Sequence, residues 1–154
     1  MTPMQPLLAL LAQSEAERDK VQAELTRVTG LHQSAQAQAE QLLNYRRDYE
    51  TRWTQQFRTA STMTLVQCYR GFMQRLTLAV EQQQQMAKQA ALQVGQVRTA
   101  LVAQELRVAT VRKLIERGVC EDRIAQARKD QKTSDEFAAR AAWNRSQADA
   151  AAPV

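Results

Sequence analysis

The sequence predicts an all-α protein, namely a long antiparallel two-helix coiled coil (a helical hairpin) followed by a C-terminal helical overhang. The first observation is a shortage of turn residues: the 154-residue chain has 4 glycines and 3 prolines, and no proline lies between Pro6 and Pro153. The second is composition, because Ala and Gln make up roughly 30% of the residues, far above ordinary usage. The third is an apolar pattern with alternating steps of four and three, which is typical of a coiled coil.

The heptad pattern is clearest in the second half of the chain. It continues without a break for about seven heptads, well beyond what a chance pattern would give. Thr64 and Gln67 have the spacing of a capping box, so we expect this helix to begin near Thr64 and to span about residues 64–132. The seam consists of Tyr69, Met73, Leu76, Val80, Gln83, Ala87, Ala90, Val94, Val97, Leu101, Gln104, Val108, Val111 and Ile115.

A weaker copy of the same pattern runs from Leu7 to Trp53, and it predicts a first helix over about residues 4–58. The stretch FRTASTMT separates the two patterns, and we expect a turn at about residues 59–63, centred near Ser61. In an antiparallel pair, the numbers of facing residues add up to a constant. With a total of 122, Val28 faces Val94 and Trp53 faces Tyr69, so apolar residues meet along nearly the whole length. A parallel dimer of hairpins could use the same stripes.

The second helix has no predicted partner beyond about Gly118, because the N-terminal end of the first helix lies opposite that position. The remaining residues form the overhang. We expect a break at KDQKT, residues 129–133, followed by a weaker helical tail at about 134–150. The whole chain, residues 1–154, is expected to form a single coiled-coil domain.

The residue types that usually carry chemistry are sparse. His32 is the one histidine, and Cys68 and Cys120 lie too far apart for metal-ligand spacing. No glycine cluster could hold a phosphate. We therefore expect no catalytic site, no metal and no cofactor. The formal charge of +5 permits acidic partners without selecting among them. The apolar N-terminal stretch lacks a signal peptide's basic front and is too short to span a membrane.

Aromatic residues gather near the expected turn. In the predicted register, two residues of each helix take heptad position g on the same edge of the pair, and two seam residues of each helix lie beside them. A two-helix coil cannot fully cover rings at position g, and exposed rings often mark a docking site. The alternative is that these rings only enlarge the core. We call the set the ribbon: Gln38, Leu42, Tyr45, Tyr49, Phe72, Leu76, Ala79 and Gln83.

Four segments of the chain resemble the flagellar export protein family FliJ: LLNYRRDY, YRGFMQRLTLAVEQQ, RKLIERG and ARKDQKTSDEFAARAA. The resemblance implies a cytoplasmic, non-enzymatic stalk of the flagellar type III export apparatus, peripheral at the inner membrane through its partners. It implies that the end with the chain termini binds and activates the hexameric export ATPase. It also implies binding of free export chaperones, and of the export-gate membrane protein FlhA through the eight ribbon residues.

Two alternatives are compatible with the same sequence features. The chain could be the related stalk of a virulence-type injectisome, which would share the fold. It could also be a basic coiled coil that binds nucleic acid, although no base-stacking or groove-reading module is present and no nucleic acid partner is expected.

Overall fold

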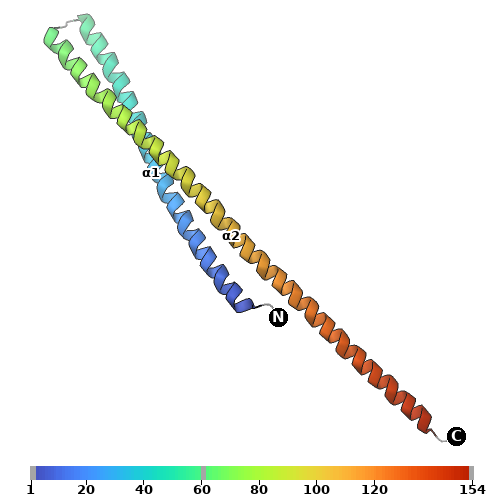
Figure 1. Ribbon diagram of the computed structural model, residues 1–154. Coiled ribbons are helices and arrows are strands. Elements are labelled where there is room, and N and C mark those ends of the chain that lie inside the picture. Colours follow the sequence, from blue (N-terminus) through green and yellow to red (C-terminus); the bar gives the residue numbers. More distant parts are fainter. Residues whose placement is uncertain (1–2, 60–61, 153–154) are drawn as a thin grey trace. The chain divides into compact units, whose positions relative to one another are not determined.

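The computed structural model describes residues 3–59 and 62–152, which form two helices (Figure 1). Helix α1 spans Met4–Thr59 and helix α2 spans Met63–Ala151. Among the described residues only Pro3, Thr62 and Ala152 lie outside them, and there is no strand. The two helices pack against each other, so the predicted all-α helical hairpin is confirmed.

The start of α2 corrects one detail of the sequence prediction. The Thr62 hydroxyl oxygen accepts a hydrogen bond from the Leu65 backbone N–H at 3.3 Å, and the Thr62 carbonyl accepts one from Val66 at 3.1 Å. Thr62 is therefore the N-cap, and Thr64 already lies inside the helix. Several neighbouring hydroxyl residues could serve as a cap, and the capping-box spacing indicated Thr64 in place of Thr62. Ser61, the predicted centre of the turn, lies outside the described residues.

The expected break at residues 129–133 is wrong, because α2 continues through this stretch. KDQKT is polar but contains neither glycine nor proline, so nothing in it prevents a helix. Side-chain hydrogen bonds one turn apart accompany it: Gln126 donates to Asp130 at 3.0 Å, and Gln131 donates to Asp135 at 3.1 Å. Contacts of this spacing stabilise a helix surface.

The contacts divide the chain into two compact units. The first contains residues up to Glu15 together with residues from Arg107 onward, and the second is Ala16–Leu106. The single-domain description therefore stays a prediction. In the second unit the two helices lie side by side and are antiparallel: α1 runs toward the turn and α2 runs away from it (Figure 1). Its core contains Val28 and Val80, each 2% exposed.

The first unit has a core of the same kind. Val108 and Val111 are buried there, at the seam positions that the heptad pattern predicts. On the edge of this seam, Arg112 of α2 pairs with Glu15 of α1, with 2.9 Å between guanidinium nitrogen and carboxylate oxygen. These two residues lie on the edge where an antiparallel pair brings its e positions together.

Among the described residues, the C-terminal part of α2 has no packing partner, as expected. Gly118 is buried and Asp122 half-buried, but every described residue from Arg123 onward is exposed. Phe137 and Trp143 stand in this exposed region. We call residues 123–152 the overhang. In the part of the chain that the structure describes, no helix has the length and apolar character needed to cross a membrane.

Candidate protein-binding surface near the turn

The eight ribbon residues all lie in the unit formed by Ala16–Leu106. Four come from α1 and four from α2, at the three- and four-residue spacings that keep them on one side of each helix. Most of them are partly covered by the neighbouring helix, as residues at or beside a coiled-coil seam should be.

Tyr49 is the centre of the ribbon's aromatic part. Its ring centroid lies 4.4 Å from that of Phe72 on the other helix, and 6.1 Å from that of Tyr45 one turn away on its own helix. The Tyr45 ring stacks on Tyr49 with 24° between the ring planes, yet Tyr45 remains 50% exposed. The ring planes of Tyr49 and Phe72 are tilted by 46°, so the pair avoids the face-to-face arrangement that aromatic rings disfavour. Tyr45 is thus supported by Tyr49, while about half of its surface stays exposed.

The ring cluster extends toward the turn beyond the ribbon. Trp53 and Tyr69, which the predicted register pairs, have ring centroids 5.6 Å apart, so the register is confirmed here. Phe57 packs on both of them, at 5.3 Å from each. Phe57 lies near the end of α1, within the range predicted for the first helix, although the predicted seam stops at Trp53. The apolar rings therefore continue almost to the end of the hairpin.

The other ribbon residues differ in how accessible they are. The Gln83 side-chain amide donates a hydrogen bond to the Gln38 side-chain oxygen at 2.8 Å, which joins the two helices at the far end of the ribbon. Leu42 and Ala79 are half-buried. Leu76 is only 7% exposed, so it belongs to the core and supports the surface from below. The alternative interpretation of the ribbon as core thus holds for this residue.

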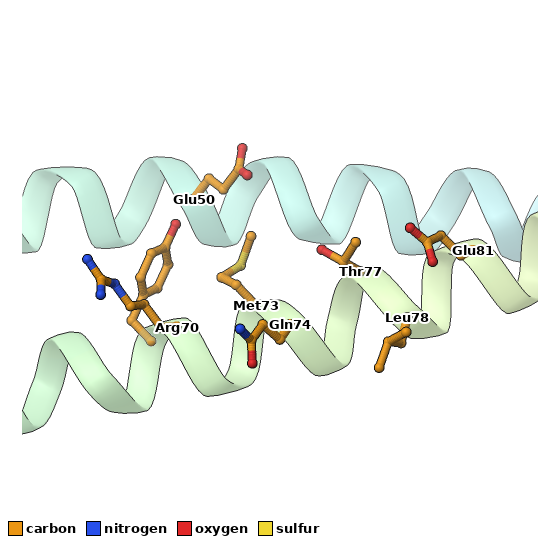
Figure 2. A pocket seen from close by; sticks show the side chains of 8 residues that line it. Glu50, Arg70, Met73, Gln74, Thr77, Leu78 and Glu81 are labelled. Atoms are coloured by element: carbon orange, nitrogen blue, oxygen red, sulfur yellow. The ribbon is translucent and has the colours of Figure 1, made fainter.

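The opposite edge of the same unit carries an open groove that the sequence analysis did not single out (Figure 2). It has a volume of about 660 Å³. Glu50 reaches it from α1, and the other lining residues come from α2, including Arg70, Met73, Leu78 and Glu81. Heptad positions could have indicated this edge, because Glu50 and Arg70 both occupy position e, opposite the g edge of the ribbon.

One titratable group in the groove is perturbed. Burial raises the pKa of the Tyr69 phenol above its usual value of 10.0, and the neighbouring negative charge of Glu50 raises it further. Both effects disfavour the phenolate. Tyr69 therefore stays neutral to a higher pH than an ordinary tyrosine does. No cluster of three or more potential metal ligands occurs among residues 3–59 and 62–152.

Comparison with known proteins gives one family. A family model described as "Flagellar FliJ protein" matches residues 4–147 of the 154. The chain belongs to the FliJ family. Membership indicates a component of the flagellar type III export apparatus. Members of this family are in general non-enzymatic and interact with other components of the apparatus. No curated protein and no solved structure matches the chain.

Proposed function

We propose that this FliJ-family chain is a stalk that binds and activates the hexameric export ATPase, binds the gate protein FlhA, and binds free export chaperones. It catalyses no reaction itself, and it resides in the cytoplasm at the inner membrane through the export apparatus. Family membership supports the flagellar machine over the injectisome reading. The observation that carries the proposal is the partly exposed ring cluster on one edge of the hairpin.

The gate contact is assigned to the ribbon. Tyr45 and Phe72 provide aromatic surface, and Tyr49 holds them together from the seam. Large rings on a rigid base bind well because little conformational entropy is lost when a partner covers them. The bonded pair of Gln38 and Gln83 gives the surface a polar end. An apolar centre with a polar rim is the usual organisation of a protein interface.

The ATPase contact is assigned to the unit that contains the chain ends. There the paired helices give way to the overhang, whose residues are exposed on every side. A single helix in water gains little from packing, so it depends on helix propensity, and the overhang is rich in Ala. Exposed Phe137 and Trp143 are large apolar groups that an enclosing partner would cover.

Alanine substitutions test the gate assignment. Tyr45→Ala and Phe72→Ala should each weaken binding to the cytoplasmic part of FlhA by tenfold or more, since central aromatic contacts are often worth about 2 kcal/mol. Leu92→Ala is the matched control, because Leu92 is 68% exposed and lies outside the ribbon. Binding is measured by calorimetry, and helicity by circular dichroism. Wild-type affinity in both variants, with helicity retained, would remove the ribbon from the proposal.

A truncation separates the two ends. A chain that stops after Asp122 lacks the overhang but keeps the seam and the ribbon. We expect it to bind FlhA normally and to lose its stimulation of ATP hydrolysis by the export ATPase. Full stimulation by the truncated chain would show that the overhang is not the part the ATPase recognises.

A further inference from the structure

The charges of this chain are unevenly distributed around the turn. Residues 51–80 contain four arginines and neither aspartate nor glutamate, although the chain has 16 acidic residues in all. We call this stretch, as far as the structure describes it (51–59 and 62–80), the tip segment. It accounts for most of the formal charge of +5. The tip segment is thus strongly cationic, while the rest of the chain is close to neutral.

The four arginines are exposed, and they lie on different sides of the helix pair. Arg52 occupies heptad position g and Arg70 position e, so they lie on opposite edges. Arg58 and Arg75 lie on the outward faces of their helices. Within the described residues, none of the four forms an ion pair. Their charges are therefore exposed to solvent on several sides of the tip segment. The four arginines do not all line one groove.

Exposed apolar side chains accompany these charges. Met63, the first residue of α2, is 73% exposed, and Leu65 is 37% exposed. Arg58 is next to the last residue of α1. Arg52 and Arg70 lie seven residues from the ends of their helices, which is about 10 Å at 1.5 Å per residue. Measured along their own helices, these three positive charges thus lie within about 10 Å, or about one Debye length, of the helix ends at the turn.

We propose that the tip segment docks directly on an anionic lipid surface, with Met63 entering the headgroup region and Arg52, Arg58 and Arg70 binding lipid phosphates. Charge complementarity supports a bilayer as the partner. Arginines on several sides of the helix pair do not form one compact interface, whereas a fluid array of anionic headgroups around the tip segment can reach all of them. This lipid contact is separate from the ribbon. It would add to the association with the inner membrane through protein partners that the family resemblance implies.

Vesicle co-sedimentation of the full-length chain tests the proposal. The chain should bind vesicles of phosphatidylglycerol and phosphatidylethanolamine, bind vesicles of phosphatidylcholine far less, and lose binding as salt is raised. Each arginine near the surface should contribute about fivefold to the partition coefficient. Arg52→Gln/Arg58→Gln/Arg70→Gln should therefore lower it roughly hundredfold, and Met63→Ser should lower it further.

The control variants distinguish the position of the lost charges from the loss of charge itself and from loss of folding. Arg98→Gln/Arg123→Gln/Arg140→Gln removes the same charge from exposed sites outside the tip segment and should change vesicle binding little. Arg58→Gln/Arg70→Gln spares the edge that Arg52 shares with Tyr45, and it should still cost about 25-fold. Circular dichroism verifies that each variant remains helical.

Three results would overturn the proposal: equal binding to neutral and anionic vesicles, no binding to either, or equal losses in the two triple variants. Salt-dependent binding to duplex DNA in the absence of vesicle binding would replace the bilayer by nucleic acid. FlhA affinity is measured in parallel on the same variants. Loss of vesicle binding with normal FlhA binding would separate this surface from the ribbon, so either proposal can fail alone.

Discussion

Single residues of the seam carry most of the packing in each unit. Val28 and Val80 are almost fully covered, whereas Val102 of the same helix as Val80 is 65% exposed. Burying an apolar side chain releases its hydration shell, and a deletion there leaves a cavity that neighbours only partly fill. The contribution of a valine to stability thus depends mainly on its heptad position, because that position decides whether its side chain is buried.

Val80→Ala should lower the free energy of unfolding by about 2 kcal/mol, because it removes buried methyl groups and leaves a cavity. Val102→Ala is the matched control and should change it by less than about 0.5 kcal/mol, as expected for an exposed site. Urea denaturation followed by circular dichroism measures both. Equal effects of the two substitutions would contradict the seam assignment.

The Tyr69 phenol predicts a pH dependence at the alkaline end. Its pKa is raised in the folded chain by burial and by Glu50, so the unfolded chain loses this proton at a lower pH than the folded chain does. The contribution to stability is therefore complete below the unfolded pKa, near 10.0, and it declines as the pH rises through the folded pKa.

Melting temperatures between neutral pH and the alkaline range measure this effect. The wild-type chain should lose stability above the usual tyrosine pKa, and Tyr69→Phe should show a smaller loss over the same range. Phenolate absorbance, compared between the two chains, identifies the titrating ring. Parallel melting curves at every pH would mean that Tyr69 does not titrate differently in the folded chain.

At the scale of the elements, the long helices depend on different stabilising terms along their lengths. Where α1 and α2 are paired, the apolar seam contributes most of the stability. In the overhang, helix propensity and i,i+4 side-chain pairs such as Gln126 with Asp130 must suffice. This explains why the polar stretch KDQKT stays helical although it has no seam residue to bury.

The start of α2 offers a paired test. Thr62→Ala removes the hydroxyl that accepts the Leu65 N–H, and it should cost about 1 kcal/mol of stability. Thr64→Ala changes a neighbouring exposed threonine inside the helix, where Ala has the higher helix propensity, so it should be neutral or slightly stabilising. The denaturation midpoints of the two variants decide which threonine is the cap. A larger loss with Thr64→Ala would restore the capping box predicted from the sequence.

At the scale of the whole molecule, the antiparallel hairpin brings together residues that are distant in the sequence. Glu15 and Arg112 are 97 residues apart in the sequence and form an ion pair. The pair is largely exposed, so it contributes little to stability, but it reports the register of the two helices. A parallel dimer of hairpins is the competing arrangement that the heptad pattern by itself allows.

Spin labels distinguish these arrangements. With Cys68 and Cys120 replaced by Ser, labels at positions 15 and 112 should lie at a separation typical of side chains on helices packed about 10 Å apart. Labels at 15 and 129 should be farther apart, because 17 residues of α2 add about 25 Å. Dilution with unlabelled chain should leave the short distance unchanged. Its disappearance on dilution would mean that the contact is between two molecules.

The periodic features of this protein follow from its amino-acid sequence without knowledge of the fold. The steps of four and three fixed which residues face the partner helix, and the constant total of facing numbers paired Trp53 with Tyr69. The sequence also indicated the FliJ family, which the family model supports. These features follow from helix geometry, which is set by local spacing and repeats along the whole chain.

Which of these residues are buried and which are exposed became clear from the packed helices. The tertiary structure placed Leu76 in the core and left Tyr45 half exposed, although both belong to the predicted ribbon. It selected Thr62 as the cap and created the groove beside Glu50. The reason is that exposure and hydrogen bonding depend on how the side chains of both helices pack in the space between them. A heptad pattern specifies which way a side chain points from its helix, but it does not specify that packing.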